Sequence, residues 1–228
     1  MIKIKYISHS TILLIINEIY ILVDPFFTDN PILKNKNINI FKKIDYILIT
    51  HAHIDHTKDV NNIYKIYNST IISNFEICQY YNKKFKLFKY INLNFGSFLK
   101  INKYLYIKYV YALHSSSFYD GTYGGNAGGF IIKYKNKYIY IAGDTDIFYD
   151  MNYFNIKFNL IILPIGGIFT MDYRSAYLAS NLLKCNNIMG VHYNTFTEIK
   201  INKNKIFKYF KNKGKNIFLL KEFDNIII

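Results

Sequence analysis

Residues 46–56 read Tyr46-Ile47-Leu48-Ile49-Thr50-His51-Ala52-His53-Ile54-Asp55-His56. An apolar run typical of a buried strand is followed at once by three histidines and a carboxylate within six residues. Neutral imidazole and carboxylate are ligands that zinc and similar divalent cations prefer. The whole chain contains only six histidines, so this concentration of them after one strand predicts a metal site and, with it, a metallohydrolase.

Length and composition predict a single domain that spans residues 1–228. The 228 residues are 51% hydrophobic, which is enough for a substantial core, and no Pro/Gly/Ser-rich linker divides them. The apolar stretch Ile12–Val23 is interrupted by Asn17-Glu18, so we interpret it as two strands joined by a turn and expect no membrane span. The N-terminus does not resemble a signal peptide, and Cys78 and Cys185 are far apart. We therefore expect a cytoplasmic protein without structural disulfides.

The formal net charge of +14 invites a nucleic-acid interpretation, because lysine-rich surfaces attract phosphate. However, lysine, asparagine, isoleucine and tyrosine are enriched throughout the chain, and Arg174 is the only arginine. This pattern is typical of a genome biased towards A·T-rich codons, whereas nucleic-acid readers usually rely on arginine. We therefore expect no dedicated nucleic-acid surface, and the sequence leaves homo-oligomer formation open.

The order of the predicted elements indicates an α/β fold. Strands are expected at Ile2–Ile7, Ile12–Ile16, Ile19–Val23, Tyr46–Ile49, Leu105–Leu113, Gly128–Tyr134, Tyr138–Ala142, Leu160–Leu163, Ile188–Val191 and Ile217–Leu220. Helices are expected at Lys58–Tyr67, Asn74–Lys83, Asp172–Leu183 and Lys203–Lys211. Two rounds of strands followed by helices predict two sheets packed face to face, with the helices outside.

Three further candidate ligands each follow a predicted strand. His114, Asp144 and His192 come directly after apolar runs, and the ends of strands are rigid platforms whose loops can converge on one point. A histidine by itself is more often structural than a metal ligand. Several ligand types at successive strand ends favour a site.

With these residues, the chain resembles the metallo-β-lactamase fold superfamily, and within it the UPF0173 type of metal-dependent hydrolase. The motifs that carry the resemblance are His9-Ser10, Val23-Asp24-Pro25-Phe26, the cluster His51 to His56, Ala112-Leu113-His114-Ser115-Ser116, Ala142-Gly143-Asp144-Thr145, Leu163-Pro164-Ile165-Gly166, Phe169-Thr170-Met171 and His192-Tyr193-Asn194-Thr195-Phe196. The resemblance implies a four-layer αβ/βα sandwich of two mixed sheets flanked by helices, with the site along one edge between the sheets.

The resemblance also implies a ligand set. One cation would be held by His51, His53 and His114, a second by Asp55, His56 and His192, and Asp144 would bridge the two. Seven ligands are too many for one tetrahedral zinc but suit two cations that share a carboxylate and a hydroxide. We expect zinc, with manganese as the alternative, and we expect Asp55 and Asp144 to be the catalytic carboxylates. Superfamily members with a redox di-iron site usually carry glutamate where this chain has His53, so the resemblance implies hydrolysis.

Four other residues are expected to support the site. Asp24 would accept a hydrogen bond from a metal-ligating imidazole or a backbone amide. His9 would bind substrate or orient Asp24, although a histidine satisfied within a turn is an equal alternative. Asn126 lies in the glycine-rich loop Tyr123–Gly129, where backbone amides can approach an anion. Asn126 and Tyr193 are expected to contact substrate.

These observations favour a hydrolase of a small ester, lactone or phosphorylated metabolite. The alternative is a ribonuclease or phosphodiesterase that uses the same metals on nucleic acid, with lysines guiding the phosphate backbone. A non-catalytic metal-binding scaffold would be expected to have a broken ligand set, and this set is complete.

Overall fold

The computed structural model describes residues 1–33 and 39–228, which form two seven-stranded sheets. In spatial order, the first sheet contains β14 (Asn225–Ile227), β1 (Ile2–Ser8), β2 (Thr11–Ile16), β3 (Ile19–Val23), β4 (Tyr46–Leu48), β5 (Thr70–Asn74) and β6 (Tyr90–Leu93). The second contains β13 (Asn216–Phe218), β12 (Asn187–Val191), β11 (Leu160–Pro164), β10 (Lys137–Ile141), β9 (Gly128–Tyr134), β8 (Leu105–Tyr111) and β7 (Leu99–Lys100).

Both sheets are mixed and follow the same plan. In the first sheet, β14, β1, β2 and β3 pair antiparallel, and β3 to β6 pair parallel. In the second, β7 to β10 pair antiparallel, and β10 to β13 pair parallel. The antiparallel strands need only short turns, whereas the parallel ones are joined by crossovers that carry the helices. The prediction of an α/β fold with two mixed sheets is confirmed.

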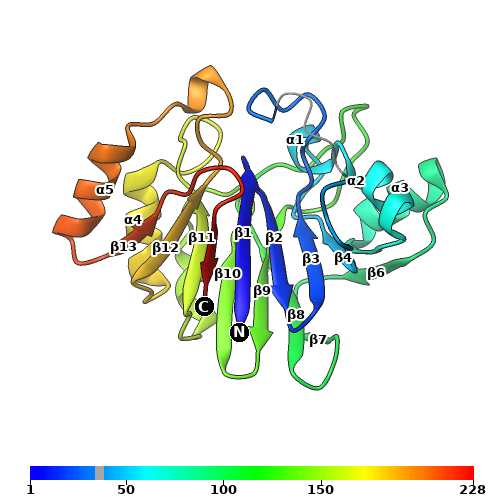
Figure 1. Ribbon diagram of the computed structural model, residues 1–228, viewed down its shortest axis with the longest axis horizontal. Coiled ribbons are helices and arrows are strands. Elements are labelled where there is room, and N and C mark those ends of the chain that lie inside the picture. The colour runs from blue at the N-terminus through cyan, green and yellow to red at the C-terminus, as the bar shows by residue number, and fades with distance from the viewer. Residues whose placement is uncertain (34–38) are drawn as a thin grey trace.

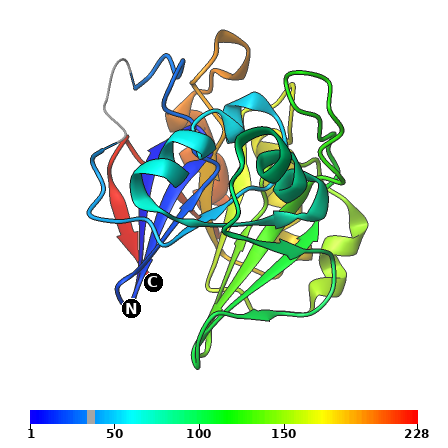
Figure 2. The ribbon, with the colours of Figure 1, turned by 90° about the vertical axis from the view of Figure 1, so that its right-hand side faces the viewer.

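Helices cover the outer face of each sheet. They are α1 (Ile54–Thr57), α2 (Val60–Tyr67), α3 (Phe75–Phe85), α4 (Tyr173–Leu182) and α5 (Lys203–Asn212), with two short 3₁₀ segments at Tyr149–Phe154 and Thr197–Ile199. Figure 1 shows α2 and α3 on one side of the sheets and α4 and α5 on the other. In Figure 2 the blue strands of the first sheet lie beside the green strands of the second. The arrangement is the expected four-layer sandwich.

Side-chain alternation places the main core between the sheets. In β1, Ile2, Ile4 and Tyr6 are buried in this core, while Lys3 and Lys5 alternate with them and are only partly buried. By contrast, β11 is buried along its whole length, because one face meets the other sheet and the opposite face meets the helices. Separate apolar clusters lie under α2 and α3 and under α4 and α5. No helix in the described ranges is long and apolar enough to span a bilayer.

Hydrogen-bonding side chains cap the crossover helices α3 and α4 at their N-termini. Asn74 caps α3 by accepting a hydrogen bond from the backbone amide of Ile77 at 2.8 Å. Asp172 caps α4 by accepting from the amides of Arg174 and Ser175. Both caps satisfy backbone donors that the first turn of a helix leaves free.

All of the strands and helices expected from the sequence form, with some ends displaced by one or two residues. The expected helix over Lys58–Tyr67 begins at Val60, and the expected strand over Leu105–Leu113 ends at Tyr111. The structure also contains α1, β5, β6, β7 and β14, which were not predicted from the sequence. Three of these strands, β6, β7 and β14, are short and lie at sheet edges, so pairing with a neighbour rather than their own pattern makes them strands.

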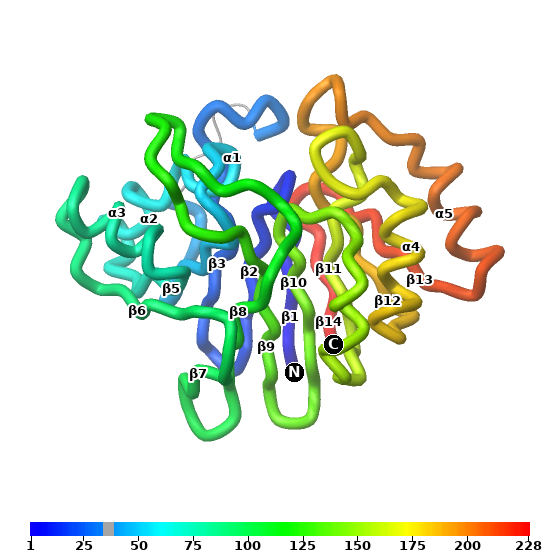
Figure 3. Tube along the Cα trace, turned by 180° about the vertical axis from the view of Figure 1, so that it is seen from behind, coloured from blue at the N-terminus to red at the C-terminus, as the bar shows by residue number. Residues whose placement is uncertain are grey.

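The end of the sandwich opposite the chain termini carries the histidines. Figures 1 and 3 show both termini at the lower end, with the loops after β4, β8, β10 and β12 gathered at the upper end. Two groups of the second sheet bind Thr50, the residue before the first histidine of the cluster. The Tyr109 hydroxyl and the Gly128 amide both donate to the Thr50 carbonyl, at 2.8 and 3.1 Å. The second sheet therefore holds the loop that follows β4.

We expect Gly128→Ala to destabilise this junction. A Cβ at position 128 would lie 2.3 Å from Cζ of Tyr109, so the ring and its hydrogen bond to Thr50 would have to move. Overpacking of this kind costs about 1–3 kcal/mol, measured as a fall in the free energy of unfolding in urea. Gly96→Ala is the matched control, because its added Cβ meets nothing within 4 Å. Equal unfolding free energies for the two variants would contradict the prediction.

Candidate metal centre

The loop after β4 and the one-turn helix α1 present the clustered ligands. His51 and His56 are fully buried, whereas Asp55 retains 19% exposure of its side chain. The Thr57 hydroxyl donates to the His53 carbonyl at 2.8 Å, which stabilises the turn from loop to helix. Because α1 makes one turn here, Asp55 and His56 are presented from adjacent positions of the same short helix.

Three imidazole nitrogens form the first group. Nε2 of His51 lies 3.0 Å from Nδ1 of His53, and Nε2 of His114 lies 3.3 Å from the same atom. Together they satisfy the spacing expected of ligands to one metal ion. Neutral imidazoles each offer a lone pair in such a position, and a cation among them would accept all three.

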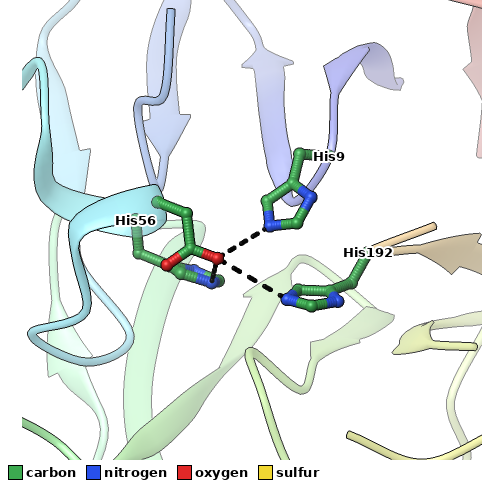
Figure 4. A group of neighbouring side chains, drawn as sticks. His9, His56 and His192 are labelled. Atoms are coloured by element: carbon green, nitrogen blue, oxygen red, sulfur yellow. Dashed lines mark hydrogen bonds and ion pairs between the residues drawn. The ribbon is translucent and has the colours of Figure 1, made fainter. Parts of the chain in front are cut away.

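A carboxylate and two imidazoles form the second group. Oδ2 of Asp55 lies 3.6 Å from Nε2 of His56 and 3.7 Å from Nε2 of His192. Figure 4 shows the His56 and His192 rings converging from different elements on this carboxylate oxygen. This group also has metal-ligand spacing.

Asp144, on the loop after β10, lies between the two groups. Its Oδ2 is 3.0 Å from Nε2 of His192 and 3.3 Å from Nε2 of His56. The same oxygen is 3.8 Å from Nε2 of His114 and 3.9 Å from Nε2 of His51. One carboxylate oxygen therefore faces ligands of both groups.

The structure offers an independent test of whether these residues fit a metal. Nε2 of His56 and Oδ1 of Asp144 are buried and have no hydrogen-bond partner among the described residues. A buried polar atom without a partner costs about 1–3 kcal/mol, so such atoms call for a missing partner. A divalent cation supplies one, and the donor set of imidazole and carboxylate is the one that zinc and manganese accept.

Hydrogen bonds join the loops that carry the ligands. The amide of His192 donates to the His9 carbonyl at 3.1 Å, which links the ends of β12 and β1. The amide of Leu113 donates to Oγ1 of Thr145 at 3.0 Å, which holds His114 beside Asp144. Four segments distant in the chain are thereby held at one edge of the sandwich.

Asp24 orients two of the candidate ligands, His51 and His56, through hydrogen bonds on the side away from the centre. Its Oδ2 lies 2.9 Å from Nδ1 of His56 and accepts from the Thr50 hydroxyl at 2.7 Å, while Oδ1 accepts from the Thr50 amide. Because the Thr50 hydroxyl donates to Asp24, it can accept from Nδ1 of His51, 3.0 Å away. Both rings then carry their proton on Nδ1, which leaves Nε2 free to bind a cation. This role of Thr50 was not predicted from the sequence, although its place directly before His51 was a signal.

The charges of the centre shift the pKa values of its members. Burial lowers the pKa of His51 well below its ordinary value. Burial also acts against charge on His192, but Asp144 and Asp55 outweigh it and raise the pKa of His192 to about 9. The same balance raises the pKa of His56. Although burial opposes ionisation, the imidazoles hold the pKa values of Asp144 and Asp55 well below their ordinary range.

A cavity of about 960 Å³ opens directly onto the centre. Five of its lining residues are apolar or aromatic, namely Phe26, Ile54, Tyr119, Phe169 and Phe196. The ring centroids of Phe26 and Phe196 are 6.3 Å apart, and these two residues reach the cavity from opposite ends of the chain. Of the fourteen described lining residues, Lys58 is the only lysine or arginine, and its Nζ lies 2.6 Å from Oδ2 of Asp29.

The three residues expected to contact substrate do not line this cavity. His9 is fully buried beside Asp55, and burial lowers its pKa to about 4. Tyr193 is buried, stacks on Tyr6 and donates to the Leu220 carbonyl. The Asn126 side chain is exposed and accepts from the Tyr123 hydroxyl. This placement does not fit direct contact between these residues and substrate. The expectation differed from the structure because local sequence could not show which way the loops turn.

The chain is similar in sequence to known metal-dependent hydrolases. The sequence model of the Beta-lactamase superfamily domain matches residues 20–193. A UPF0173 metal-dependent hydrolase of Flavobacterium johnsoniae is 47% identical over 220 residues, 96% of each chain. One from Pyrococcus abyssi is 40% identical over 223 residues, again 96% of each chain.

A solved structure is similar over nearly the full length. Igni18, a metallo hydrolase from Ignicoccus hospitalis, superposes with a TM-score of 0.88 at 32% identity, covering 99% of this chain and 97% of its own. The chain therefore belongs to the UPF0173 metal-dependent hydrolases, within the β-lactamase superfamily. The resemblance recognised from the motifs is confirmed, and the protein is a metal-dependent hydrolase.

We expect Asp24→Ala to weaken metal binding without removing any proposed ligand. Loss of the carboxylate frees the rings of His51 and His56 to rotate, and loss of such a support typically lowers metal affinity about 10–100-fold. Competition with a chromogenic chelator measures the affinity. Asp59→Ala is the control: this buried carboxylate accepts hydrogen bonds from the amides of Phe27 and Thr28 instead of from a ligand. Equal losses of affinity in both variants would count against the prediction.

Metal affinity should rise with pH between pH 6 and 8. The pKa of His192 is raised to about 9 and that of His56 is also raised, by Asp144 and Asp55. Both shifts favour the protonated imidazole in the metal-free protein, whereas a cation requires the unprotonated form. Binding must then release protons, and each released proton strengthens apparent affinity by up to about tenfold per pH unit. Calorimetry of metal binding in two buffers of different ionisation enthalpy counts these protons. Identical heats in the two buffers would contradict the prediction.

Proposed function

We propose that this hydrolase uses two divalent cations, zinc or manganese, to cleave a small ester, lactone or phosphoester. His51, His53 and His114 would hold one cation, and Asp55, His56 and His192 the other. Asp144 Oδ2 would be shared, because it faces both groups at 3.0–3.9 Å. The single observation that carries the proposal is this shared carboxylate between two groups of ligand spacing.

The two cations, once bound, would supply a hydroxide nucleophile at neutral pH by lowering the pKa of a water molecule. The protein contributes the geometry around that nucleophile. His53 and His114 are partly exposed towards the cavity, so substrate approaches from their side. Asp55 and Asp144 are the carboxylates that line the cavity beside the ligating nitrogens, and they are placed to accept a proton from the attacking water.

The cavity supports a small-molecule substrate over nucleic acid. Its volume of about 960 Å³ suits a small organic molecule, and its apolar walls would pack against uncharged groups. A nucleic-acid channel would need several cations along the phosphate backbone, whereas the described lining contains one, Lys58, already paired with Asp29. The net charge of +14 is therefore not concentrated at the site.

A cytoplasmic location is also part of the proposal. Cys78 and Cys185 are both buried and unpaired, which is typical of proteins kept in a reducing compartment. Homo-oligomer formation stays open as an expectation from the sequence.

We expect His51→Ala and Asp144→Ala to lose bound metal and to reduce hydrolysis at least about 100-fold, because each removes a ligand from the centre. The substrates are a panel of small esters, lactones and phosphoesters, and metal content is measured by mass spectrometry. Asp146→Ala is the matched control, since Asp146 is exposed and its side chain accepts a hydrogen bond from the backbone amide of Ile147 instead of from a candidate ligand.

Two outcomes would overturn the proposal. Retention of metal and of hydrolysis in both ligand variants would remove the site assignment. Tight, steeply salt-dependent binding of RNA together with its cleavage, and no turnover of the small substrates, would favour the nuclease instead.

A further inference from the structure

His9 is the one histidine without a place in the ligand set, yet it is among the most buried residues. It follows β1, has a left-handed backbone with φ of 56°, and has no exposed surface. Its ring centroid lies 4.1 Å from that of His192, and its carbonyl accepts the backbone amide of His192. Figure 4 shows His9 facing the carboxylate on which His56 and His192 converge. A polar ring in this position needs partners, and the structure supplies two.

Both ring nitrogens of His9 are engaged. Nε2 lies 3.0 Å from Oδ2 of Asp55, and Nδ1 lies 2.9 Å from Oγ1 of Thr195. An ionised carboxylate can only accept, so Nε2 carries a proton and donates it to Asp55. The Thr195 hydroxyl engages the opposite nitrogen, so the ring is held at both ends and cannot turn away from Asp55.

Asp55 is the member of the set that most needs such a support. It lies on α1, which has only four residues, and its side chain is more exposed than that of Asp144. Its contact with His9 at 3.0 Å is shorter than its contacts with His56 and His192, at 3.6 and 3.7 Å. His9 is therefore the nearest of the three imidazoles to Oδ2 of Asp55.

We propose that His9 is a positioning residue, which holds Asp55 Oδ2 in place to bind the second cation beside His56 and His192. The inference rests on the proposed two-metal function. It assigns to His9, Thr195 and Asp55 a chain of hydrogen bonds comparable to the carboxylate supports that orient ligating histidines, with the roles of imidazole and carboxylate exchanged. His9 would act through Asp55 and would touch neither substrate nor metal.

A competing role is that His9 is itself a ligand, because its side chain groups with Asp55, His56 and His192 at metal-ligand spacing. Both ring nitrogens of His9 already have hydrogen-bond partners, whereas Nε2 of His56 is buried without one, and this difference favours support by His9 over ligation. Nε2 of His9 cannot carry a proton and bind a cation at the same time. A glutamine at position 9 can donate a hydrogen bond but is a poor metal ligand, so the two roles predict different metal affinities for that variant.

The test uses the full-length protein with His9→Phe and His9→Gln. The Gln amide nitrogen is the same number of bonds from the backbone as Nε2 of His9 and can still donate to Asp55, whereas Phe keeps the ring without a donor. Metal-free protein is titrated with Zn²⁺, and with Co²⁺ to follow ligand-field absorption. We expect His9→Phe to lower the affinity for the second equivalent of metal about 10–100-fold and to leave the affinity for the first nearly unchanged. We expect His9→Gln to retain most of the affinity for the second equivalent.

Each other outcome has a distinct meaning. If the affinity for the second equivalent of metal fell as much in His9→Gln as in His9→Phe, His9 would be a ligand and the positioning role would be overturned. Unchanged affinities in His9→Phe would also overturn it, even if thermal unfolding of the metal-free variant showed lower stability. Should His9→Phe fail to fold, Thr195→Val removes the outer hydrogen bond to His9, together with the longer 3.4 Å bond from the Thr195 hydroxyl to the Tyr193 carbonyl. An unchanged affinity for the second cation in that variant would overturn the proposal. Wild-type protein that binds one equivalent only would instead refute the two-metal proposal itself.

Discussion

Asp24, buried at the end of β3, accepts hydrogen bonds from the amide and hydroxyl of Thr50 and lies 2.9 Å from Nδ1 of His56. A buried carboxylate must be paired to remain ionised, and here its partners are the residues that present the ligands. Burial raises the pKa of Asp24, whereas a cation bound to the imidazoles would favour the ionised form. The other features of the site depend on this one: where Thr50 is held, which nitrogen of His51 faces the centre, and how His56 is turned.

The two-sheet architecture brings the remaining ligands to the same point. In both sheets the parallel strands end at one edge, and the loops that follow β4, β10 and β12 leave from that edge. The second sheet contacts the first through the Tyr109 hydroxyl and the Gly128 amide, both on the Thr50 carbonyl. Because this contact ends at the residue before His51, packing between the sheets also holds the loop that carries the candidate ligands His51 and His53.

Much of the fold and of the candidate site was predictable from local sequence patterns, and the exceptions have physical causes. Alternating and continuous apolar runs predicted the central strands, since burial on one or both faces leaves a clear periodicity. The edge strand β14 has little pattern of its own and forms because it pairs with β1. Tyr193 follows a ligand in sequence but turns into the core against Tyr6, because the backbone of His192 and Asn194 adopts left-handed conformations, with φ of 55° and 60°. Tyr193 is therefore adjacent to His192 in the sequence but does not line the cavity.

The candidate ligand types, their order at successive strand ends, the α/β class and the family could all be predicted from the sequence, because these depend on residue identity and on the short-range periodicity of strands and helices. Which residues meet across the sandwich became clear only in the folded molecule. The tertiary structure paired His9 with Asp55 and Thr195, brought Phe26 against Phe196 at the cavity, and left Asn126 and Tyr193 outside it. The physical reason is that such contacts join segments up to 186 residues apart, whose relative positions follow from sheet packing and loop geometry that no local pattern encodes.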